Sequence, residues 1–110
     1  MASAMKPDDR FEVIDALYRF AAGQDLRDAE LLASAFAPQA QLDFLQPARK
    51  LGVELPVFKG REGIVSSIRG APADIDTTHT VTNTRVVITG ERASLFALVE
   101  AQHLPRSDHG

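Results

Sequence analysis

The last third of the chain constrains the fold most, because it predicts a single β-hairpin with long arms. Residues 77–89 are dense in threonine and valine, and residues 92–103 alternate small or apolar side chains with mixed ones. Both patterns are typical of strands that bury one face. Gly90 and Glu91 lie between the two segments and can form the tight turn. Other elements must then cover the apolar face of this hairpin.

The register of the hairpin decides whether two of its histidines meet. If Thr89 pairs with Ala93, His79 pairs directly with His103; if Thr89 pairs with Arg92, the two imidazoles fall on opposite faces. We predict the first register, because it separates apolar residues from threonines. The predicted apolar face contains Val81, Val87, Leu95, Ala97, Val99 and Ala101, and the predicted polar face contains Thr78, Thr80, Thr82 and Thr84.

The first half of the chain predicts the helices that form the cover. After Asp8 or Asp9 as N-cap, apolar residues recur at helical spacing. Gly23 can end this helix in the left-handed region, so we predict a helix over residues 9–22.

A second helix and several shorter segments follow. Asp28 can cap the second helix, and Pro38 stops it. The other predicted segments are a strand at residues 40–44, a loop over residues 45–56, an extended piece at Val57 and Phe58, a third short helix between Gly60 and Gly70, and a polar loop over residues 71–76.

This order of elements predicts the α+β class, with helices on one face of an antiparallel sheet. We expect one domain over residues 9–110, because 110 residues support one core and leave little room for a second. Residues 1–8 are small or polar and are predicted to be a flexible leader.

Composition excludes more partners than it identifies. The net charge is −3, which argues against nucleic acid or an anionic membrane as the main partner. The chain has no cysteine, which excludes a disulfide framework and any cysteine-ligated metal site. No signal-like segment and no apolar run long enough to span a membrane is present, so a cytoplasmic location is predicted.

The strong sequence motifs of nucleotide-binding, zinc-protease and serine-hydrolase sites are absent, so the candidate site rests on histidines and carboxylates. Asp25 lies in the turn between the two helices that cover the hairpin. A carboxylate there can meet His79 or His103, hold one imidazole tautomer and make that ring a general base. Asn83 lies two residues after Val81 on the same predicted face and can form a hydrogen bond with a ligand, and a role in the strand pairing or in a turn is the alternative. A local cap for Asp25, and a purely structural role for the histidines, remain alternatives.

Four segments carry a resemblance to a known family. They are residues 16–38 (ALYRFAAGQDLRDAELLASAFAP), residues 42–44 (LDF), residues 58–64 (FKGREGI) and residues 77–83 (TTHTVTN). Together they resemble the SnoaL-like branch of the nuclear transport factor 2-like superfamily. The resemblance implies a curved antiparallel sheet closed into a cone by three helices. It also implies two further strands, so we expect the C-terminal strands to be missing from this chain or supplied by another subunit.

Within that superfamily the chain looks most like the scytalone dehydratase and hexachlorocyclohexane dehydrochlorinase families. The dehydratase resemblance implies that Asp25, His79 and His103 line the cavity. The dehydrochlorinase resemblance implies that Asp25 and His79 form the pair that abstracts a proton. Where the dehydratase has tyrosines, this chain has Gln24 and Phe44, so the resemblance does not extend to the dehydratase's own substrate.

The resulting prediction is a lyase or isomerase without cofactor or metal, acting on a small, largely apolar substrate that is cyclic or aromatic. His79 is the predicted base, Asp25 orients it, and His103 is a second acid, base or substrate-binding group. A non-catalytic ligand-binding or dimerisation module is the alternative, and a metal site at the same three residues is a third hypothesis. A homo-oligomer, dimer or trimer, is expected. The predicted substrate-binding residues are Tyr18, Phe36, Phe44, Phe58, Val81, Asn83 and Val99.

Overall fold

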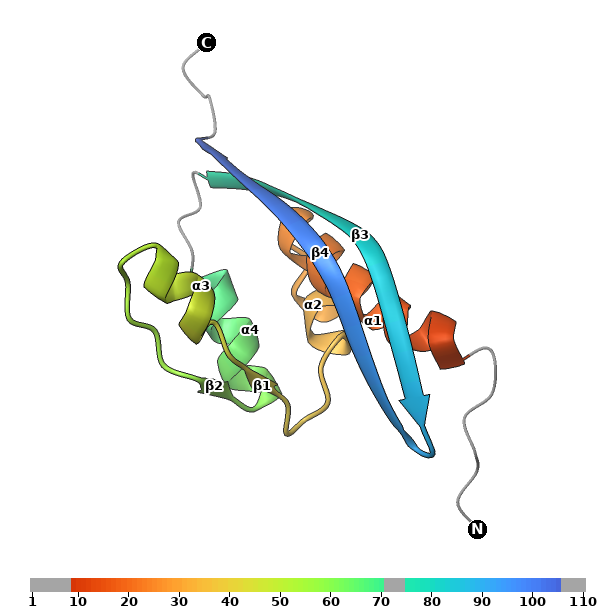
Figure 1. Cartoon of the computed structure of the whole chain (residues 1–110). Helices are drawn as coiled ribbons and strands as arrows, with labels where there is room; N and C mark the ends of the chain where they lie inside the picture. The colour runs from red at the N-terminus through yellow and green to blue at the C-terminus, as the bar shows by residue number, and fades with distance from the viewer. Residues whose placement is uncertain (1–8, 71–74, 106–110) are drawn as a thin grey trace.

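The computed structural model describes residues 9–70 and 75–105, which contain four helices and four strands (Figure 1). The helices are α1 (Asp9–Asp25), α2 (Ala29–Ser34), α3 (Leu45–Lys50) and α4 (Arg61–Arg69). The strands are β1 (Gln41–Leu42), β2 (Phe58–Lys59), β3 (Ile75–Thr89) and β4 (Arg92–Pro105). Helices combined with antiparallel strands confirm the predicted α+β class. The predicted leader at residues 1–8 and most of the predicted loop at residues 71–76 lie outside the described residues.

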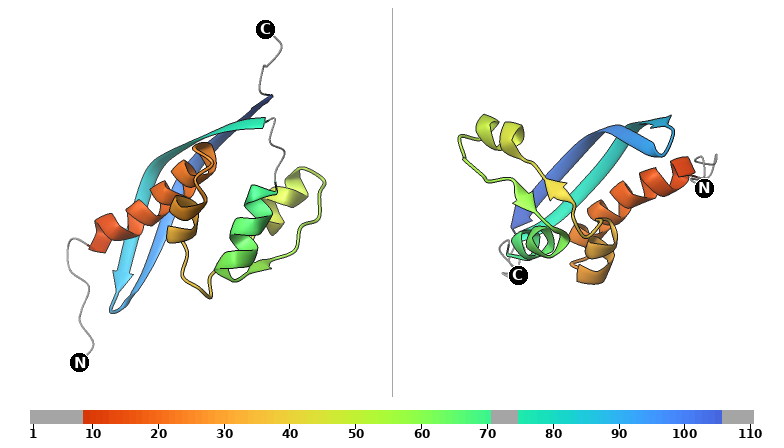
Figure 2. Two further views of the ribbon diagram at one scale, coloured as in Figure 1. Left: turned by 180° about the vertical axis from the view of Figure 1, so that it is seen from behind. Right: turned by 90° about the horizontal axis from the view of Figure 1, so that it is seen from below.

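The predicted long hairpin is confirmed as β3 and β4, which pair only with each other in the described part of the chain. Thr89 pairs with Arg92 around the turn at Gly90 and Glu91. Gly90 has φ 61° and Glu91 has no positive φ, which is the pattern of a type II′ turn. The hairpin curves along α1, which packs against β3 more than against β4 (Figure 2). The other sheet is short and consists of β1 paired with β2.

The predicted hairpin register is wrong, and a β-bulge is the reason. The turn pairs Thr89 with Arg92, a register that by itself separates the two histidines. Between Thr82 and Arg85 the ladder shifts, so that Asn83 and Thr84 lie opposite Ala97 alone.

The extra residue reverses the faces of the strand beyond it. Asn83 adopts φ 55°, a left-handed conformation that asparagine tolerates better than most residues. Beyond the bulge His79 pairs with Ala101 and Thr77 pairs with His103. The two histidines are therefore diagonal neighbours on one face, although not the direct pair that was predicted.

The same bulge corrects the predicted composition of the two faces. Val87 was predicted on the apolar inner face but points outward and is 52% exposed. Thr84 was predicted on the polar face but is half-buried with Val86 and Ile88. Both residues lie between the bulge at Asn83 and the turn. There the odd-numbered and even-numbered side chains of β3 face the opposite way from those around His79.

The first helix extends beyond its predicted end. Gly23 does not terminate α1 but is buried inside it, where it faces Leu32 of α2. The residue that leaves the helix in the left-handed region is Arg27, with φ 54°. Asp28 then caps α2 as predicted, since its carboxylate accepts a hydrogen bond from the backbone N–H of Leu31.

Residues 45–50 form α3 and not the loop that was predicted for residues 45–56. Asp43 starts the helix, because its carboxylate accepts a hydrogen bond from the backbone N–H of Leu45 at 2.9 Å. Pro47 lies in the first turn, where a missing N–H has little cost. Gly52, at φ 73°, follows the helix and turns the chain away.

The fully buried apolar side chains of the described residues are few, and they lie where helices meet. Leu32 of α2 and Ile64 of α4 are 1% and 0% exposed, and Ala21 and Ala48 are also buried. α1 packs against both α2 and β3, and α2 packs against α4. The contact of α1 with α2 therefore anchors the end of α1, where Asp25 lies.

Replacing Gly23 by alanine is expected to destabilise the protein by about 1–3 kcal/mol, because an added Cβ would lie 2.6 Å from the Leu32 Cα and N. Gly63 of α4 is the matched control, since a Cβ there has no neighbour within 4 Å. Gly63→Ala is expected to stabilise the protein by up to about 1 kcal/mol through helix propensity alone. Chemical denaturation measures both. A neutral Gly23→Ala variant would contradict the close helix contact.

Candidate active site

Asp25 ends α1 directly beside the beginning of β3. Its carboxylate accepts three hydrogen bonds from that strand: from the Thr77 hydroxyl at 3.0 Å, from the His79 backbone N–H at 2.8 Å and from the His79 ring. The side chain is therefore fixed in position by groups 52 and 54 residues away in sequence. Side chains alternate between the two faces of a strand, so Thr77 and His79 lie on the same face of β3 and both donate to Asp25.

The ring contact joins Asp25 Oδ1 to His79 Nδ1 at 2.6 Å. The His79 side chain is 10% exposed and that of Asp25 is 22% exposed, so little water competes with the interaction. An ionised carboxylate only accepts hydrogen bonds, so Nδ1 carries the hydrogen. In the neutral form of the ring Nε2 is then unprotonated, and this is the atom that a general base uses.

The same contacts set the charge of Asp25. Burial by itself raises the pKa of a carboxyl group, but the hydrogen bonds from the His79 ring, the His79 backbone and Thr77 outweigh it and lower the pKa of Asp25. Asp25 is therefore a carboxylate at neutral pH. Its negative charge stabilises a proton that arrives on His79.

His103 lies next to this pair on the neighbouring strand. Its ring meets that of His79 edge to face, with centroids 6.3 Å apart and an interplanar angle of 76°. The structure therefore brings together the three predicted catalytic residues, Asp25, His79 and His103. A catalytic role for them stays a prediction.

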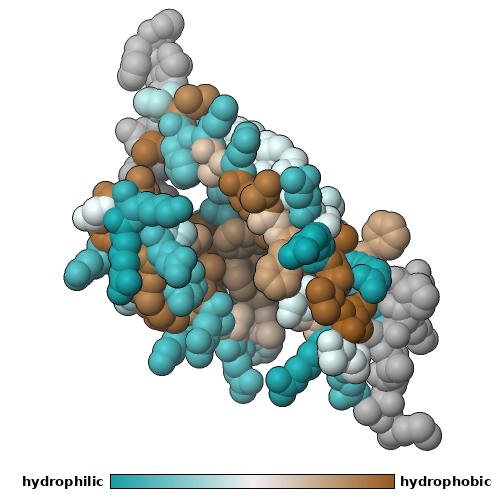
Figure 3. Space-filling model, in the orientation of Figure 1, coloured by the Kyte–Doolittle hydropathy of each residue, from teal (hydrophilic) through white to brown (hydrophobic). Residues whose placement is uncertain are grey.

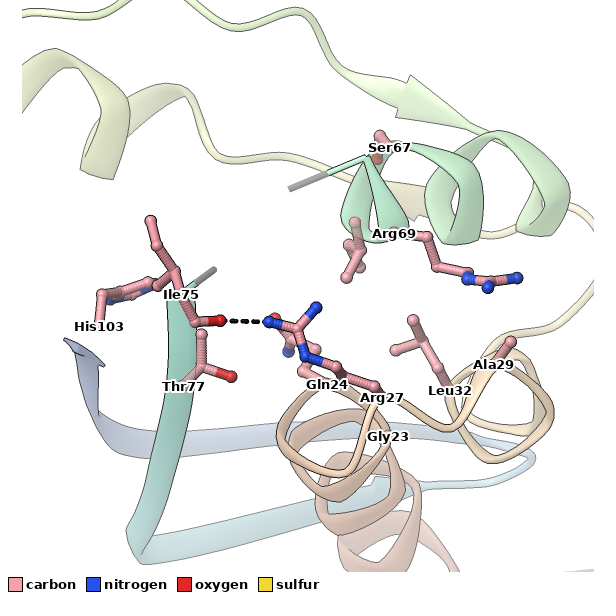
Figure 4. A pocket seen from close by; sticks show the side chains of 11 residues that line it. Gly23, Gln24, Arg27, Ala29, Leu32, Ser67, Arg69, Ile75, Thr77 and His103 are labelled. Atoms are coloured by element: carbon pink, nitrogen blue, oxygen red, sulfur yellow. Dashed lines mark hydrogen bonds between the residues drawn. The ribbon is translucent and has the colours of Figure 1, made fainter. Parts of the chain in front are cut away.

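A pocket of about 430 Å³, lined by His103 but not by His79, opens between the α1–α2 turn, the end of α4 and the ends of the hairpin (Figure 4). It shares Thr77 and His103 with the site just described, and Gln24, Arg27 and Arg69 also line it. Seen from the side of β4, the surface is hollowed between the α3–α4 part and β4, with apolar residues at the floor (Figure 3).

The predicted substrate-binding residues lie elsewhere on the described structure, and none of them is among the residues that line this pocket. Phe36 packs edge-on against Phe20 at 5.6 Å, and Phe58 in β2 pairs with Leu42 of β1. Tyr18 and Phe44 are 48% and 37% exposed, Val81 pairs with Val99 across the hairpin, and Asn83 forms the bulge. A binding role for these seven residues stays a prediction.

The residues that the prediction of the site left out are polar and line the pocket: Gln24, Arg27, Arg69 and Thr77. The position of Thr77 could have been predicted from the sequence, because Thr77 lies two residues before His79 on the same strand. The position of Arg27 had none, because the left-handed conformation that directs it is rare for arginine.

The metal hypothesis finds no ligand set in the structure. Within residues 9–70 and 75–105, no three histidine, cysteine, aspartate or glutamate side chains are grouped so as to hold an ion. Both oxygens of Asp25 already accept hydrogen bonds from Thr77 and His79. Over the same residues, every helix is too short or too polar to cross a membrane.

Comparison with known proteins supports the fold. The model of the SnoaL-like domain family matches residues 6–110. The Kfla4162 protein from Kribbella flavida has 23% identity and a TM-score of 0.75, over 91% of this chain and 66% of its own length. A scytalone dehydratase-like protein from Novosphingobium aromaticivorans has 16% identity and a TM-score of 0.70, over 93% of this chain and 65% of its own.

A third solved structure gives the same picture. A dehydratase-like protein of the nuclear transport factor 2-like family from Streptomyces avermitilis has 20% identity and a TM-score of 0.63, over 86% of this chain and 68% of its own. The chain thus spans about two thirds of the length of these structures. No curated protein matches it significantly.

Proposed function

Because this chain belongs to the SnoaL-like domain family, we propose that it is a lyase or isomerase that needs no cofactor and uses Asp25 and His79 as its catalytic pair. The observation that carries this proposal is the 2.6 Å contact between Asp25 Oδ1 and His79 Nδ1. The solved structures named above as dehydratase-like support a dehydratase-like reaction.

In the proposed reaction His79 Nε2 takes a proton from a C–H group of the substrate. The C–H electron pair becomes a C=C bond, and the leaving group departs from the neighbouring carbon with the electrons of its own bond. His103 donates a proton to that leaving group, so one molecule yields an alkene and the protonated leaving group. Asp25 stabilises the imidazolium that forms on His79.

We propose a small, largely apolar substrate with a ring or aromatic group. Outside the pocket that Thr77 and His103 line, the rest of its wall would be formed by the apolar residues Tyr18, Phe36, Phe44, Phe58, Val81 and Val99, and Asn83 would supply a hydrogen bond. Exclusion of water by such a wall strengthens the electrostatic effect of Asp25 on His79.

We also propose a cytoplasmic homo-oligomer, a dimer or a trimer. The outer face of β4 exposes Phe96, Leu98 and Leu104 at 53%, 60% and 57%, and apolar exposure on a strand at a sheet edge favours association. Light scattering is expected to give two or three times the chain mass of 11.9 kDa. A mass of one chain at micromolar concentration would contradict it.

The proposed chemistry is tested by a screen of small alcohols and halides whose departing proton lies next to a carbonyl group. The purified protein with EDTA is expected to produce an alkene, or to exchange that proton with D₂O, for at least one compound. Absorbance detects the alkene and NMR detects the exchange. If compounds bind but none of them forms an alkene or exchanges its proton, the result would favour the alternative of a non-catalytic binding module.

A further inference from the structure

We propose that the pocket lined by Thr77 and His103 recognises the carboxylate group of an acidic substrate through Arg69 and Arg27. This substrate class rests on the proposed function, because it specifies the compound on which the same site acts. The body of the substrate remains apolar and carries one negative charge.

The pocket lining is positively charged in a chain that is acidic overall. Arg27 and Arg69 contribute to it, and the described residues that line it include no aspartate or glutamate. The chain as a whole has a net charge of −3, so a cationic pocket is not a consequence of composition. Leu32 and Ile68 add apolar surface. This combination suits a ligand with an anionic group on an apolar body.

Arg69 is the residue best placed to bind an anion. It ends α4, lines the pocket and is exposed, and no carboxylate or carbonyl of the described residues accepts a hydrogen bond from it. A guanidinium group offers paired N–H donors whose spacing matches the two oxygens of a carboxylate. Arg69 can therefore bind a carboxylate without breaking a contact among these residues.

Arg27 reaches the pocket from the facing wall. Its side chain extends across the pocket and donates a hydrogen bond to the Ile75 carbonyl oxygen (Figure 4). Its φ of 54° lies in the left-handed region, where glycine would be less strained. Backbone strain of this kind is often retained where a side chain has a function. For Arg27, this function would be the binding of a ligand in the pocket.

The pocket connects the arginines with the catalytic pair. Thr77 lines the pocket and donates to Asp25 Oδ1, and His103 lines it and contacts the ring of His79. Figure 4 shows His103 and Thr77 on one side of the pocket and Arg69 on the other. Thr77 and His103 thus lie on the opposite side of the pocket from Arg69, and a ligand that spans the pocket reaches both sides.

Calorimetric titration with benzoate and benzamide tests the charge preference at constant ionic strength. The two probes have similar shape and differ in charge. The wild type is expected to bind benzoate at least about tenfold more tightly, the effect of one charge-assisted hydrogen-bond pair. Arg69→Gln is expected to reduce this preference to about twofold or less, and Arg27→Gly to weaken benzoate binding without a loss of thermal stability.

Arg49→Gln is the matched control, because Arg49 lies in α3 away from the pocket and is expected to leave the preference unchanged. Equal affinity for the two probes, or a preference that survives Arg69→Gln, would overturn the proposal. Inorganic phosphate is the competing probe. If it displaces benzoate at a concentration lower than the one at which benzoate binds, the result would also overturn the proposal, in favour of phosphate recognition. If Arg27→Gly does not fold, the exposed Arg69 variant decides.

The two proposals fail in different ways. His79→Ala is expected to retain the preference for benzoate, because binding does not need the base. A retained preference without turnover of any acid would reject the catalytic function and keep carboxylate recognition. Turnover of neutral compounds without the preference would reject carboxylate recognition and keep the catalytic function.

Discussion

Replacing His79 by alanine is expected to lower kcat/KM by about 10²- to 10⁴-fold, the usual contribution of a positioned general base. The loss arises because no other described side chain both contacts Asp25 through a ring nitrogen and faces His103. The fold is expected to persist, since the backbone N–H of residue 79 still donates to Asp25 Oδ2. Steady-state kinetics on a compound identified in the elimination screen measures the effect.

Two further variants make this result specific. His79→Gln retains a hydrogen-bonding side chain but has no basic nitrogen, so it is expected to be as inactive as the alanine variant. Thr80→Ala changes the adjacent residue on the outer face of β3 and is expected to retain full activity. Activity of the two His79 variants within about threefold of wild type would assign the base to another residue.

The exchange of Asp25 for asparagine is expected to lower kcat/KM by about 10²- to 10⁴-fold, although it changes a single oxygen to an NH₂ group. Asp25 accepts hydrogen bonds on both oxygens, and asparagine has one acceptor oxygen. Its NH₂ group must therefore face a donor of His79. If it faces the ring, Nδ1 becomes the acceptor, the hydrogen moves to Nε2, and the base loses its lone pair toward the substrate.

Thr77→Val is the matched control for Asp25→Asn. It removes one of the three donors to Asp25 and leaves both contacts with His79. Its expected cost is about tenfold or less in kcat/KM, in keeping with about 1 kcal/mol for one hydrogen bond. If Asp25→Asn had no larger effect than Thr77→Val, Asp25 would not orient the base.

Asp25 also predicts a pH dependence of stability. Its pKa is lowered in the folded state, so the unfolded chain takes up the proton first as the pH falls. The contribution of Asp25 is complete above its unfolded pKa and is lost as the pH falls through the lowered, folded value. Asp25→Asn is expected to be less stable than wild type by about 1–3 kcal/mol near neutral pH, and the difference is expected to narrow in acid. Denaturation at several pH values measures it.

The fold class was predictable from sequence because each element carries a local signal. The threonine and valine alternation around Gly90 gave the hairpin, and Asp28 gave the cap of α2. Signals that depend on tertiary contact were not readable. Gly23 was interpreted as a helix end, whereas its function is to let α1 approach Leu32. The first turn of α3 was hidden by Pro47, which is tolerated there.

Within the candidate site, the proximity of three residues could be predicted from the sequence, and little else could. His79 contacts both Asp25 and His103, but as a diagonal neighbour of His103 and through a bulge at Asn83 that a two-residue periodicity cannot show. The register at the turn differs from the predicted one by one residue, and the bulge adds one residue. Together these two shifts place the two histidines on one face, as the prediction required. The arginines of the pocket were missed because their positions depend on the left-handed backbone at Arg27 and on the packing of α4.

The most direct test of the Asp25–His79 pair is the tautomer of His79, which ¹⁵N-detected NMR of the imidazole reports without any substrate. In its neutral form the ring is expected to carry its hydrogen on Nδ1, donated to Asp25, with an unprotonated Nε2. Asp25→Asn is expected to abolish this signature. A wild-type ring with its hydrogen on Nε2, or one that exchanges freely between both tautomers, would contradict the proposed base.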